Sequence, residues 1–524
     1  MNEVGQKANG NVAHVEVSGE RSDFDLSLPA EIRTFVARPG PQSLLIRGSP
    51  GSGKTTLGLA LLGAFPGQRI LVTNRVSDTE LRGDFPWLHL GGVDPIQVID
   101  ASNRTRGLAE AALAVHDLPK VLSGETGGEV SNFMWLPEAV QEAYSSMESD
   151  RPSMVIIDSW DALVEDFMAT RPSGHLPTPV REDVERLLLS FMRRSGVTLV
   201  LILERDVQTQ LDYLVNAVVT TEKELVNGRL ERWLYIPKLR GQRIETPSYP
   251  FSLEGSRFRT VRPFRFGRRT NGGQRASEIA GEPPPEPMVG RVWPGCIDFA
   301  MAFGMFNVGA TTVIETDPEV PHSLTQVLVD PPVVQTLLAG GRVLLIPPPG
   351  TRPDDIYQPY HSIVPAEKLA DQLRIFSVAG TEGVPEEAQA IMLPMPRGPG
   401  FRSDPIFHAA FEFIRQEGTP NVPNLIVRTT GGERALAQMV GLPVTPENFA
   451  TVAAAYVANL HSHQIVIGNI GDSLLVALND LSSIRLQLRA REGRYFLNGV
   501  RPFTPSYVIT EGDQLCPYRL MRMV

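Results

Sequence analysis

The chain has 524 residues, of which 42% are hydrophobic and 21% are charged, and its formal net charge is -10. This length predicts two or three domains, and the acidic balance argues against a protein whose whole surface binds nucleic acid. The two cysteines, Cys296 and Cys516, argue against a disulfide framework or a zinc cluster and favour a reducing, cytoplasmic location.

The first 22 residues are polar and are expected to form a flexible tail. They lack the apolar core of a signal peptide. No stretch of the chain approaches the roughly 18 apolar residues of a membrane span, so no membrane partner is expected.

Residues 23–262 alternate short apolar runs rich in β-branched residues with helical stretches, which predicts an α/β domain with a mostly parallel twisted sheet flanked by helices. The last two predicted strands follow each other around Asn227 and Gly228 and should form a hairpin. The seven predicted strands read SLLIRG, RILVTN, IQVID, MVIID, VTLVLIL, NAVVTTEKEL and RWLYIPKL.

Residues 263–289 are rich in arginine, proline and glycine and lack apolar periodicity, which is typical of a linker. After this linker, residues 290–524 repeat the earlier pattern. Six segments match six segments of residues 23–262 in the same order, which indicates a tandem repeat of one α/β unit. Two unrelated α/β domains are the alternative.

Residues 48–55, GSPGSGKT, fit the phosphate-loop motif between an apolar strand and an apolar helix. Its glycines allow backbone N–H groups to surround phosphate oxygens, and the helix adds its positive end. Lys54 is predicted to reach the β- and γ-phosphates of ATP, and the Thr55 hydroxyl to bind Mg²⁺. The predicted nucleotide-binding residues are Gly48, Ser49, Pro50, Gly51, Ser52, Gly53, Lys54, Thr55 and Thr56.

A carboxylate should end a neighbouring strand and hold the Mg²⁺ through water. Asp158, at the end of MVIID, is the candidate. The alternative is an ordinary carboxylate at a strand end, which is common in parallel sheets.

The second copy of the motif, TDPEVPHS at residues 316–323, opposes triphosphate binding. Pro321 stands in place of Gly53 and lacks an N–H group, while Thr316 adds a side chain where Gly48 has none. Glu319 brings negative charge to an anion site. The remaining matches are His322 for Lys54, Ser323 for Thr55 and Arg428 for Asp158. The second copy is therefore expected to keep the fold and its packing role without nucleotide.

The order of these motifs resembles the KaiC-like branch of the RecA superfamily, and residues 73–88 resemble the matching segment of the archaeal gas-vesicle regulator family GvpD. The resemblance implies tandem RecA-like P-loop domains, the second degenerate, and a homo-oligomer (ring or dimer) with nucleotide at the subunit interface. It also implies that Lys238 and Arg240 contact the γ-phosphate of a neighbouring subunit. Without the resemblance they are two solvated basic residues.

The chain departs from that family at the catalytic glutamates. Arg75 and Val76 stand where KaiC-like ATPases have paired glutamates after the second strand. Asp78 and Glu80 could substitute if the segment folds back, and Glu204 could sense the γ-phosphate. Lys54, Asp158 and Glu204 are the candidate catalytic residues, and a slow or partner-stimulated ATPase is expected.

Residues 257–275 hold seven arginines, three phenylalanines and no acidic residue. Such a segment could dock an acidic protein partner, bind single-stranded nucleic acid, or form a solvated linker. Nucleic acid is the least favoured of the three because the chain is acidic overall. The leading hypothesis is a regulatory ATP-binding protein, and the alternatives are a recombinase-like DNA-binding mediator and a non-hydrolysing ATP-bound interaction module.

Overall fold

A computed structural model describes residues 28–89, 95–101, 137–148, 151–169, 181–261, 264, 280–285, 288–376, 385–392, 404–416, 421–440, 444–512 and 516–524. The predicted tail and most of the predicted linker lie outside these residues. Contacts between residues divide the chain into two compact units. The first comprises Met1–Lys223 with Arg232–Thr260, and the second comprises Glu224–Glu231 with Val261–Val524.

The first unit is built on a nine-stranded sheet with the order β3-β2-β4-β5-β1-β6-β7-β8-β9. Strands β1 to β6 pair in parallel, and β8 pairs antiparallel with β7 and β9. The strands are β1 (Ser43–Gly48), β2 (Gln68–Thr73), β3 (Gln97–Asp100), β4 (Ser153–Asp158), β5 (Val197–Ile202), β6 (Ala217–Val226), β7 (Arg229–Leu239), β8 (Ser248–Ser252) and β9 (Arg259–Thr260).

Helices cover both faces of this sheet because successive strand residues point to opposite sides. Leu44 and Ile46 of β1 pack with α2, α3 and α4, whereas Leu45 packs with α7, α8 and α9 on the other face. The helical segments are α2 (Ala30–Val36), α3 (Lys54–Ala64), α4 (Asp78–Asp84), η1 (Pro86–His89), α7 (Glu138–Ser145), α8 (Trp160–Ala169), α9 (Arg181–Arg194), α10 (Leu211–Leu214) and η4 (Glu254–Ser256).

The second unit holds another nine-stranded sheet, with the order β14-β13-β15-β16-β12-β17-β18-β19-β20. A small pair, β10 (Arg291–Val292) and β11 (Phe306–Asn307), lies outside it. The strands of the large sheet are β12 (Thr311–Thr316), β13 (Val343–Ile346), β14 (Leu373–Ile375), β15 (Asn424–Thr429), β16 (Ser462–Asn469), β17 (Ser482–Arg491), β18 (Arg494–Arg501), β19 (Ser506–Glu511) and β20 (Tyr518–Arg522).

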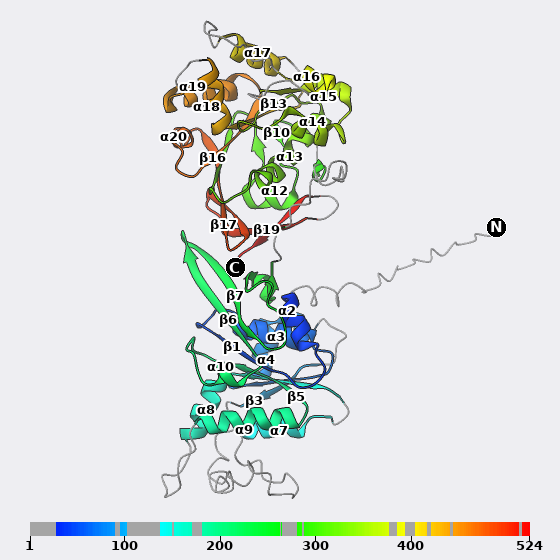
Figure 1. Cartoon of the computed structure of the whole chain (residues 1–524), viewed down its shortest axis with the longest axis vertical. Coiled ribbons are helices and arrows are strands. Elements are labelled where there is room, and N and C mark those ends of the chain that lie inside the picture. Colours follow the sequence, from blue (N-terminus) through cyan, green and yellow to red (C-terminus); the bar gives the residue numbers. More distant parts are fainter. Residues whose placement is uncertain are drawn as a thin grey trace, which may run out of the picture. The chain divides into compact units, whose positions relative to one another are not determined.

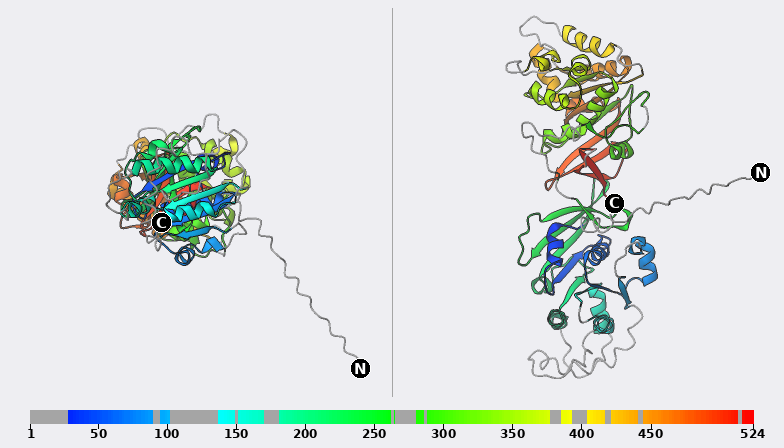
Figure 2. Two further views of the ribbon diagram at one scale, coloured as in Figure 1. Left: turned by 90° about the horizontal axis from the view of Figure 1, so that it is seen from below. Right: turned by 90° about the vertical axis from the view of Figure 1, so that its right-hand side faces the viewer.

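The helices of the second unit also cover both faces of their sheet (Figures 1 and 2). Residues of α12 to α16 pack on one face, and residues of α17 to α20 on the other. These helices are α12 (Ile297–Phe303), α13 (His322–Ala339), α14 (Pro353–His361), α15 (Ala366–Gln372), α16 (Glu386–Ala390), α17 (Asp404–Arg415), α18 (Thr430–Val440), α19 (Pro446–Asn459) and α20 (Ser473–Val476).

The two large sheets have the same strand order, position by position. Strand β12 occupies the place of β1, β13 that of β2, and the match continues to β20 and β9. In both sheets the central strands pair in parallel, and the strands at one edge pair antiparallel. The predicted tandem of RecA-like α/β units is therefore confirmed.

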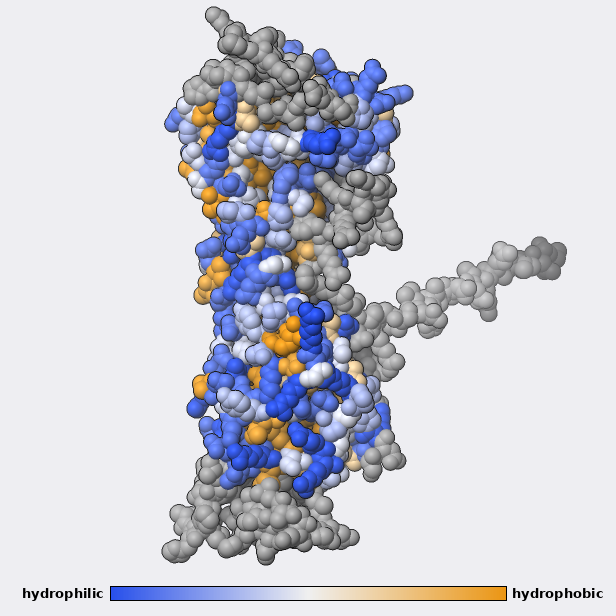
Figure 3. Space-filling model, in the orientation of Figure 1, coloured by the Kyte–Doolittle hydropathy of each residue, from blue (hydrophilic) through white to orange (hydrophobic). Residues whose placement is uncertain are grey.

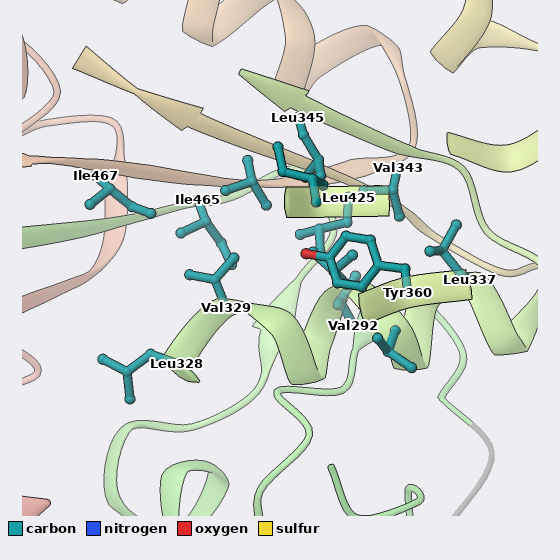
Figure 4. Packing of buried hydrophobic residues seen from close by; sticks show 14 of the residues in the cluster. Val292, Leu328, Val329, Leu337, Val343, Leu345, Tyr360, Leu425, Ile465 and Ile467 are labelled. Atoms are coloured by element: carbon teal, nitrogen blue, oxygen red, sulfur yellow. The ribbon is translucent and has the colours of Figure 1, made fainter. Parts of the chain in front are cut away.

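Buried aliphatic residues fill the space between α13 and the strands of the second sheet. Figure 4 shows Leu328 and Val329 of α13 below Ile465 and Ile467 of β16, with the ring of Tyr360 from α14 beside them. All five side chains are less than 9% exposed. The second unit therefore has an aliphatic core of its own. It lies next to residues 316–323, the second copy of the phosphate-loop motif, which we call the worn loop.

Charged and polar side chains cover much of the face shown in Figure 3, and hydrophobic residues appear there as separate patches. None of the helices among the described residues is both long enough and apolar enough to cross a bilayer. Cys296 and Cys516 are both buried, and they form no disulfide.

Candidate functional site

The phosphate loop lies between β1 and α3, where its glycines adopt conformations that other residues rarely reach. The φ angles are 150° at Gly48, 71° at Gly51 and 99° at Gly53. A Cβ atom on Gly48 would overlap the carbonyl oxygen of Thr221 on the neighbouring strand β6, and one on Gly53 would lie 3.1 Å from a ring carbon of Phe251. Both positions therefore favour glycine for conformation, and Gly48 also requires it for space.

The other predicted loop residues occupy the turn and the first turn of α3. Ser49 is half-buried and Pro50 is exposed. Ser52 is fully buried, and its hydroxyl lies 2.7 Å from that of Thr221. Thr56 is buried one residue after Thr55. The motif thus forms a glycine-rich turn followed by the N-terminal end of an 11-residue helix.

The Lys54 side chain curls over this loop. Its ammonium donates hydrogen bonds to the carbonyl oxygens of Gly48, at 2.7 Å, and Ser49, at 3.0 Å. Burial lowers the pKa of Lys54, as does the charge of Arg75, while the carboxylates of Asp158 and Glu204 oppose this shift. A cation held at the loop by weak neutral partners is suited to exchange them for phosphate oxygens.

Asp158 ends β4 next to the loop and is 4% exposed. The Thr55 hydroxyl donates to its carboxylate at 2.6 Å, so the structure brings the two predicted Mg²⁺ residues together. Burial raises the pKa of Asp158, although Thr55, Arg75 and Lys54 each favour its ionised form. Among the described residues no group of three or more His, Cys, Asp or Glu could hold a metal ion. Mg²⁺ fits such a site because it usually binds one or two protein oxygens and completes its shell with phosphate and water.

Glu204 lies just after β5 and is bound from two sides. The Ser159 hydroxyl donates to its carboxylate at 2.7 Å, and the Arg75 guanidinium forms an ion pair with it. Both partners lower the pKa of Glu204, and Arg75 has the larger effect. The backbone N–H of Glu204 also donates to Asp161 at 2.8 Å, which fixes the strand end. The site therefore combines a glycine-rich loop, a lysine, a Thr–Asp pair and an Arg–Glu pair.

Comparison with known proteins identifies this type of loop. Residues 32–236 match the family described as "GvpD gas vesicle protein, P-loop domain".

Residues 32–236 form a GvpD-like P-loop domain.

Two relatives come from Halobacterium salinarum. Protein GvpD2 is 25% identical over 487 residues, which cover 91% of this chain and 92% of the relative. Protein GvpD1 is 27% identical over 238 residues, which cover 45% of this chain and 41% of the relative. The match with GvpD2 spans too much of the chain to lie in one unit, so the likeness extends to both. A P-loop domain is a nucleotide-binding fold.

The GvpD-like segment after β2 uses its carboxylates locally. Glu80 and Ser77 form a capping box at the start of α4, in which the Ser77 N–H donates to Glu80 at 2.9 Å. Asp78 accepts from Arg82, one turn further along, at 2.8 Å. Both carboxylates considered as substitutes for the missing glutamates are therefore engaged in the helix itself.

Two basic residues that the sequence reasoning missed lie at the loop. The Arg232 guanidinium of β7 donates to the carbonyl oxygen of Gly51 at 2.6 Å. The Lys223 ammonium of β6 would be 3.0 Å from a Cβ atom placed on Gly51. Thr221 of β6 lies opposite Gly48 of β1, so residues just beyond Thr221 reach the loop, and this pairing of distant strands leaves no signal in the sequence.

Lys238 and Arg240 lie at the end of β7, where they bind the short helix α10. Lys238 donates to the carbonyl oxygen of Asp212 at 2.6 Å, and Arg240 to that of Tyr213 at 3.1 Å. The proposed contact with a neighbouring subunit remains a prediction. The side chain of Tyr213 is 68% exposed beside these two cations.

The worn loop of the second unit has a different backbone. Pro321 precedes α13 with φ -68° and ψ 143°, whereas the matching Gly53 has φ 99° and ψ 16°. The carboxylate of Glu315, one residue before the loop, is buried against Arg485 at 2.5 Å. This loop therefore lacks the left-handed residue that precedes the helix in the first loop.

Neither residue at the end of β15 can replace Asp158 as a carboxylate. Pairing with β16 places Thr429 at the position of Asp158, since Thr429 lies opposite Ile467 as Asp158 lies opposite Ile202. Pairing with β13 instead places Arg428 at the position of Asp158. Arg428 lies opposite the last residue of β13, as Asp158 lies opposite the last residue of β2. Arg428 is 1% exposed and binds Glu433 at 2.5 Å, so its charge is already neutralised.

A cavity of about 440 Å³, including its open mouth, lies at this end of the second sheet. Its walls are mostly aliphatic, and none of its lining residues is a lysine or an arginine. The lining residues are His322, Thr325, Gln326, Val329, Asp330, Leu345, Ile346, Pro347, Pro348, Ile356, Tyr360, Val427, Thr429 and Ile467. Such walls do not suit a triphosphate, which needs basic groups and backbone N–H donors.

Part of the arginine-rich segment 257–275 is described. Phe258 is 2% exposed and stacks on Phe251 with ring centroids 4.5 Å apart. Phe264 packs against the core of the second unit. Two of the three phenylalanines in the segment therefore serve core packing, which leaves fewer rings for stacking on nucleobases.

Proposed function

We propose that the first unit binds ATP with Mg²⁺ and that the chain is a nucleotide-controlled regulatory protein of the GvpD type. In this proposal the first domain spans residues 23–262 and the degenerate domain spans residues 290–524. The observation that carries the proposal is the Thr55–Asp158 contact at 2.6 Å beside Lys54 and the glycine-rich loop. This set of groups includes the loop, the lysine, the hydroxyl ligand and the second acid with which sites of this class bind a Mg²⁺-triphosphate.

Each group has a defined role in the proposal. The loop N–H groups from Ser49 to Thr56, apart from Pro50, which has none, surround the phosphates, and Lys54 neutralises their charge. The Thr55 hydroxyl binds Mg²⁺, and Asp158 holds the ion through water. Arg232 fixes the outer, carbonyl side of the loop through Gly51, so that the N–H groups face the phosphates.

Hydrolysis is proposed to be slow or stimulated by a partner. The position after β2 that carries glutamates in KaiC-like ATPases holds Arg75, and the remaining candidate base, Glu204, is bound by Arg75 and Ser159. A base held by a cation is a poor acceptor for the proton of an attacking water. A subunit or partner that displaced one of these contacts would raise turnover, and a ring or dimer joined near Lys238 and Arg240 is one such assembly.

The biological setting is proposed from the names of the relatives, which are a gas vesicle protein family and two GvpD proteins. We propose that the chain acts in the cytoplasm in the control of gas vesicles.

The test is equilibrium binding of Mg²⁺-ATP to the full chain and to Lys54→Ala. Wild type should bind, and Lys54→Ala should lose binding at least tenfold because it loses a charged hydrogen-bond donor. Arg151→Ala is a matched control, since that side chain pairs with Glu148 at the surface. Equal binding by wild type and Lys54→Ala would reject the assignment. Single-turnover hydrolysis then separates an ATPase from a module that only binds ATP.

A further inference from the structure

Arg75 and Glu204 meet across the end of the strand that carries Asp158. Strand β4 lies between β2 and β5 in the sheet, Arg75 follows β2, and Glu204 follows β5. Their ion pair therefore bridges the two strands that flank β4. Ser159, the residue after Asp158, donates its hydroxyl to the same carboxylate at 2.7 Å.

The guanidinium of Arg75 lies within electrostatic reach of the phosphate-binding groups. Its positive charge lowers the pKa of Lys54 and also opposes the rise in the pKa of Asp158 that burial causes. The Arg75 side chain is 43% exposed and the Glu204 side chain is 36% exposed, so a ligand in solvent can reach the pair. Among the described residues, Arg75 forms its ion pair with Glu204, and this pair lies beside the predicted triphosphate site.

We propose that Arg75 contacts the γ-phosphate of a bound nucleoside triphosphate, and that Glu204 holds Arg75 in place and competes with that phosphate for it. The inference rests on the proposed nucleotide binding, and it goes further by naming the residue that distinguishes triphosphate from diphosphate. Guanidinium groups bind phosphate oxygens in a bidentate manner, as they bind carboxylates, so exchange of one partner for the other needs little rearrangement.

The competition makes two predictions of opposite sign. Loss of Arg75 removes a γ-phosphate contact, so triphosphate affinity should fall about tenfold or more while diphosphate affinity changes little. Neutralising Glu204 removes both a competitor for Arg75 and a negative charge beside Lys54, so triphosphate affinity should rise severalfold. A purely structural ion pair would weaken binding of both nucleotides when either partner is changed.

The experiment is calorimetric titration of the full chain with Mg²⁺ and either ADP or the non-hydrolysable triphosphate with a β,γ-imido bridge. The variants are Arg75→Ala, Glu204→Gln and Lys54→Ala. Arg205→Ala is the matched control, since Arg205 adjoins Glu204 in sequence but pairs with Glu165. Arg205→Ala should retain the wild-type ratio of triphosphate to diphosphate affinity.

The outcomes separate this inference from the proposed function. Undiminished binding by Lys54→Ala rejects nucleotide binding at the loop, and with it both proposals. Loss of binding in Lys54→Ala, together with an unchanged affinity ratio in Arg75→Ala, rejects only the role of Arg75. A lower triphosphate affinity in Glu204→Gln rejects the competition. Circular dichroism of each variant checks the fold, which should persist because both side chains are partly exposed.

Discussion

The buried ion pair of the second unit allows a sharp stability prediction. Arg428 and Glu433 are 1% and 5% exposed and lie 2.5 Å apart, and the guanidinium carbon of Arg428 lies 4.5 Å from the ring centroid of Phe449. Arg428→Ala would leave a carboxylate buried without its counterion and a void beside Phe449. Removing one partner of a buried pair typically costs about 3–5 kcal/mol, so opening of β15 should become roughly a hundredfold or more easier.

The assay is hydrogen exchange of the full chain, followed by mass spectrometry on peptides from β15 and β16. The matched control is Arg415→Ala, since the pair of Arg415 with Glu412 is 3.8 Å long and exposed on both sides. That variant should cost about 1 kcal/mol or less. The double variant Arg428→Met with Glu433→Gln should recover much of the protection, because neither charge then remains buried. Unchanged exchange of β15 in Arg428→Ala would refute the reasoning.

Three further predictions follow from single positions. Burial lowers the pKa of His463 to about 4, and its ring forms hydrogen bonds with the Thr312 hydroxyl and the carbonyl oxygen of Asn307. The unfolded chain binds this proton at a pKa near 6.5, so the second unit should lose about 3 kcal/mol of stability as the pH falls from 6.5 to 4. Urea unfolding at several pH values checks this, and His463→Gln should flatten the slope; an equally steep slope in that variant would assign the acid sensitivity elsewhere. Gly48→Ala should abolish nucleotide binding, because its Cβ would overlap the Thr221 carbonyl oxygen, whereas Gly40→Ala has no heavy atom within 4 Å and should bind normally in the same titration. Asp158→Asn should weaken the dependence of nucleotide binding on Mg²⁺, measured with and without chelator, and an unaltered Mg²⁺ dependence would remove Asp158 from the metal site.

The sequence predicts well what local patterns determine. Each apolar run named as a strand in the first unit is a strand, because alternation and length are properties of a few adjacent residues. The phosphate loop and its helix are also local, and the order of matching segments was enough to predict a second sheet with the same strand order. The missing glycines and lysine at residues 316–323 are also a local feature. The sequence therefore predicts a loop that no longer fits a triphosphate.

The sequence predicts poorly what depends on how distant strands meet. Arg75 was recognised as a departure from the family, yet its pairing with Glu204 follows from the order β2-β4-β5, which single residues do not reveal. Arg232 contacts Gly51 only because the β6–β7 segment runs beside the loop. The match between the repeats predicts only that Arg428 replaces Asp158. Its buried ion pair with Glu433 shows that it is a core residue.

The extended backbone at Pro321 has a consequence for any attempt to restore chemistry to the second half. Introducing a lysine and an aspartate one at a time would leave the backbone of the turn unchanged. Its N–H groups would still not be arranged for binding phosphate. Glu315, Arg428 and the aliphatic cavity would oppose each intermediate, since all three are built into packing on which the unit now depends. The divergence of the two halves is therefore hard to reverse by stepwise mutation, and natural variants of this chain should differ in the first loop far less freely than in the second.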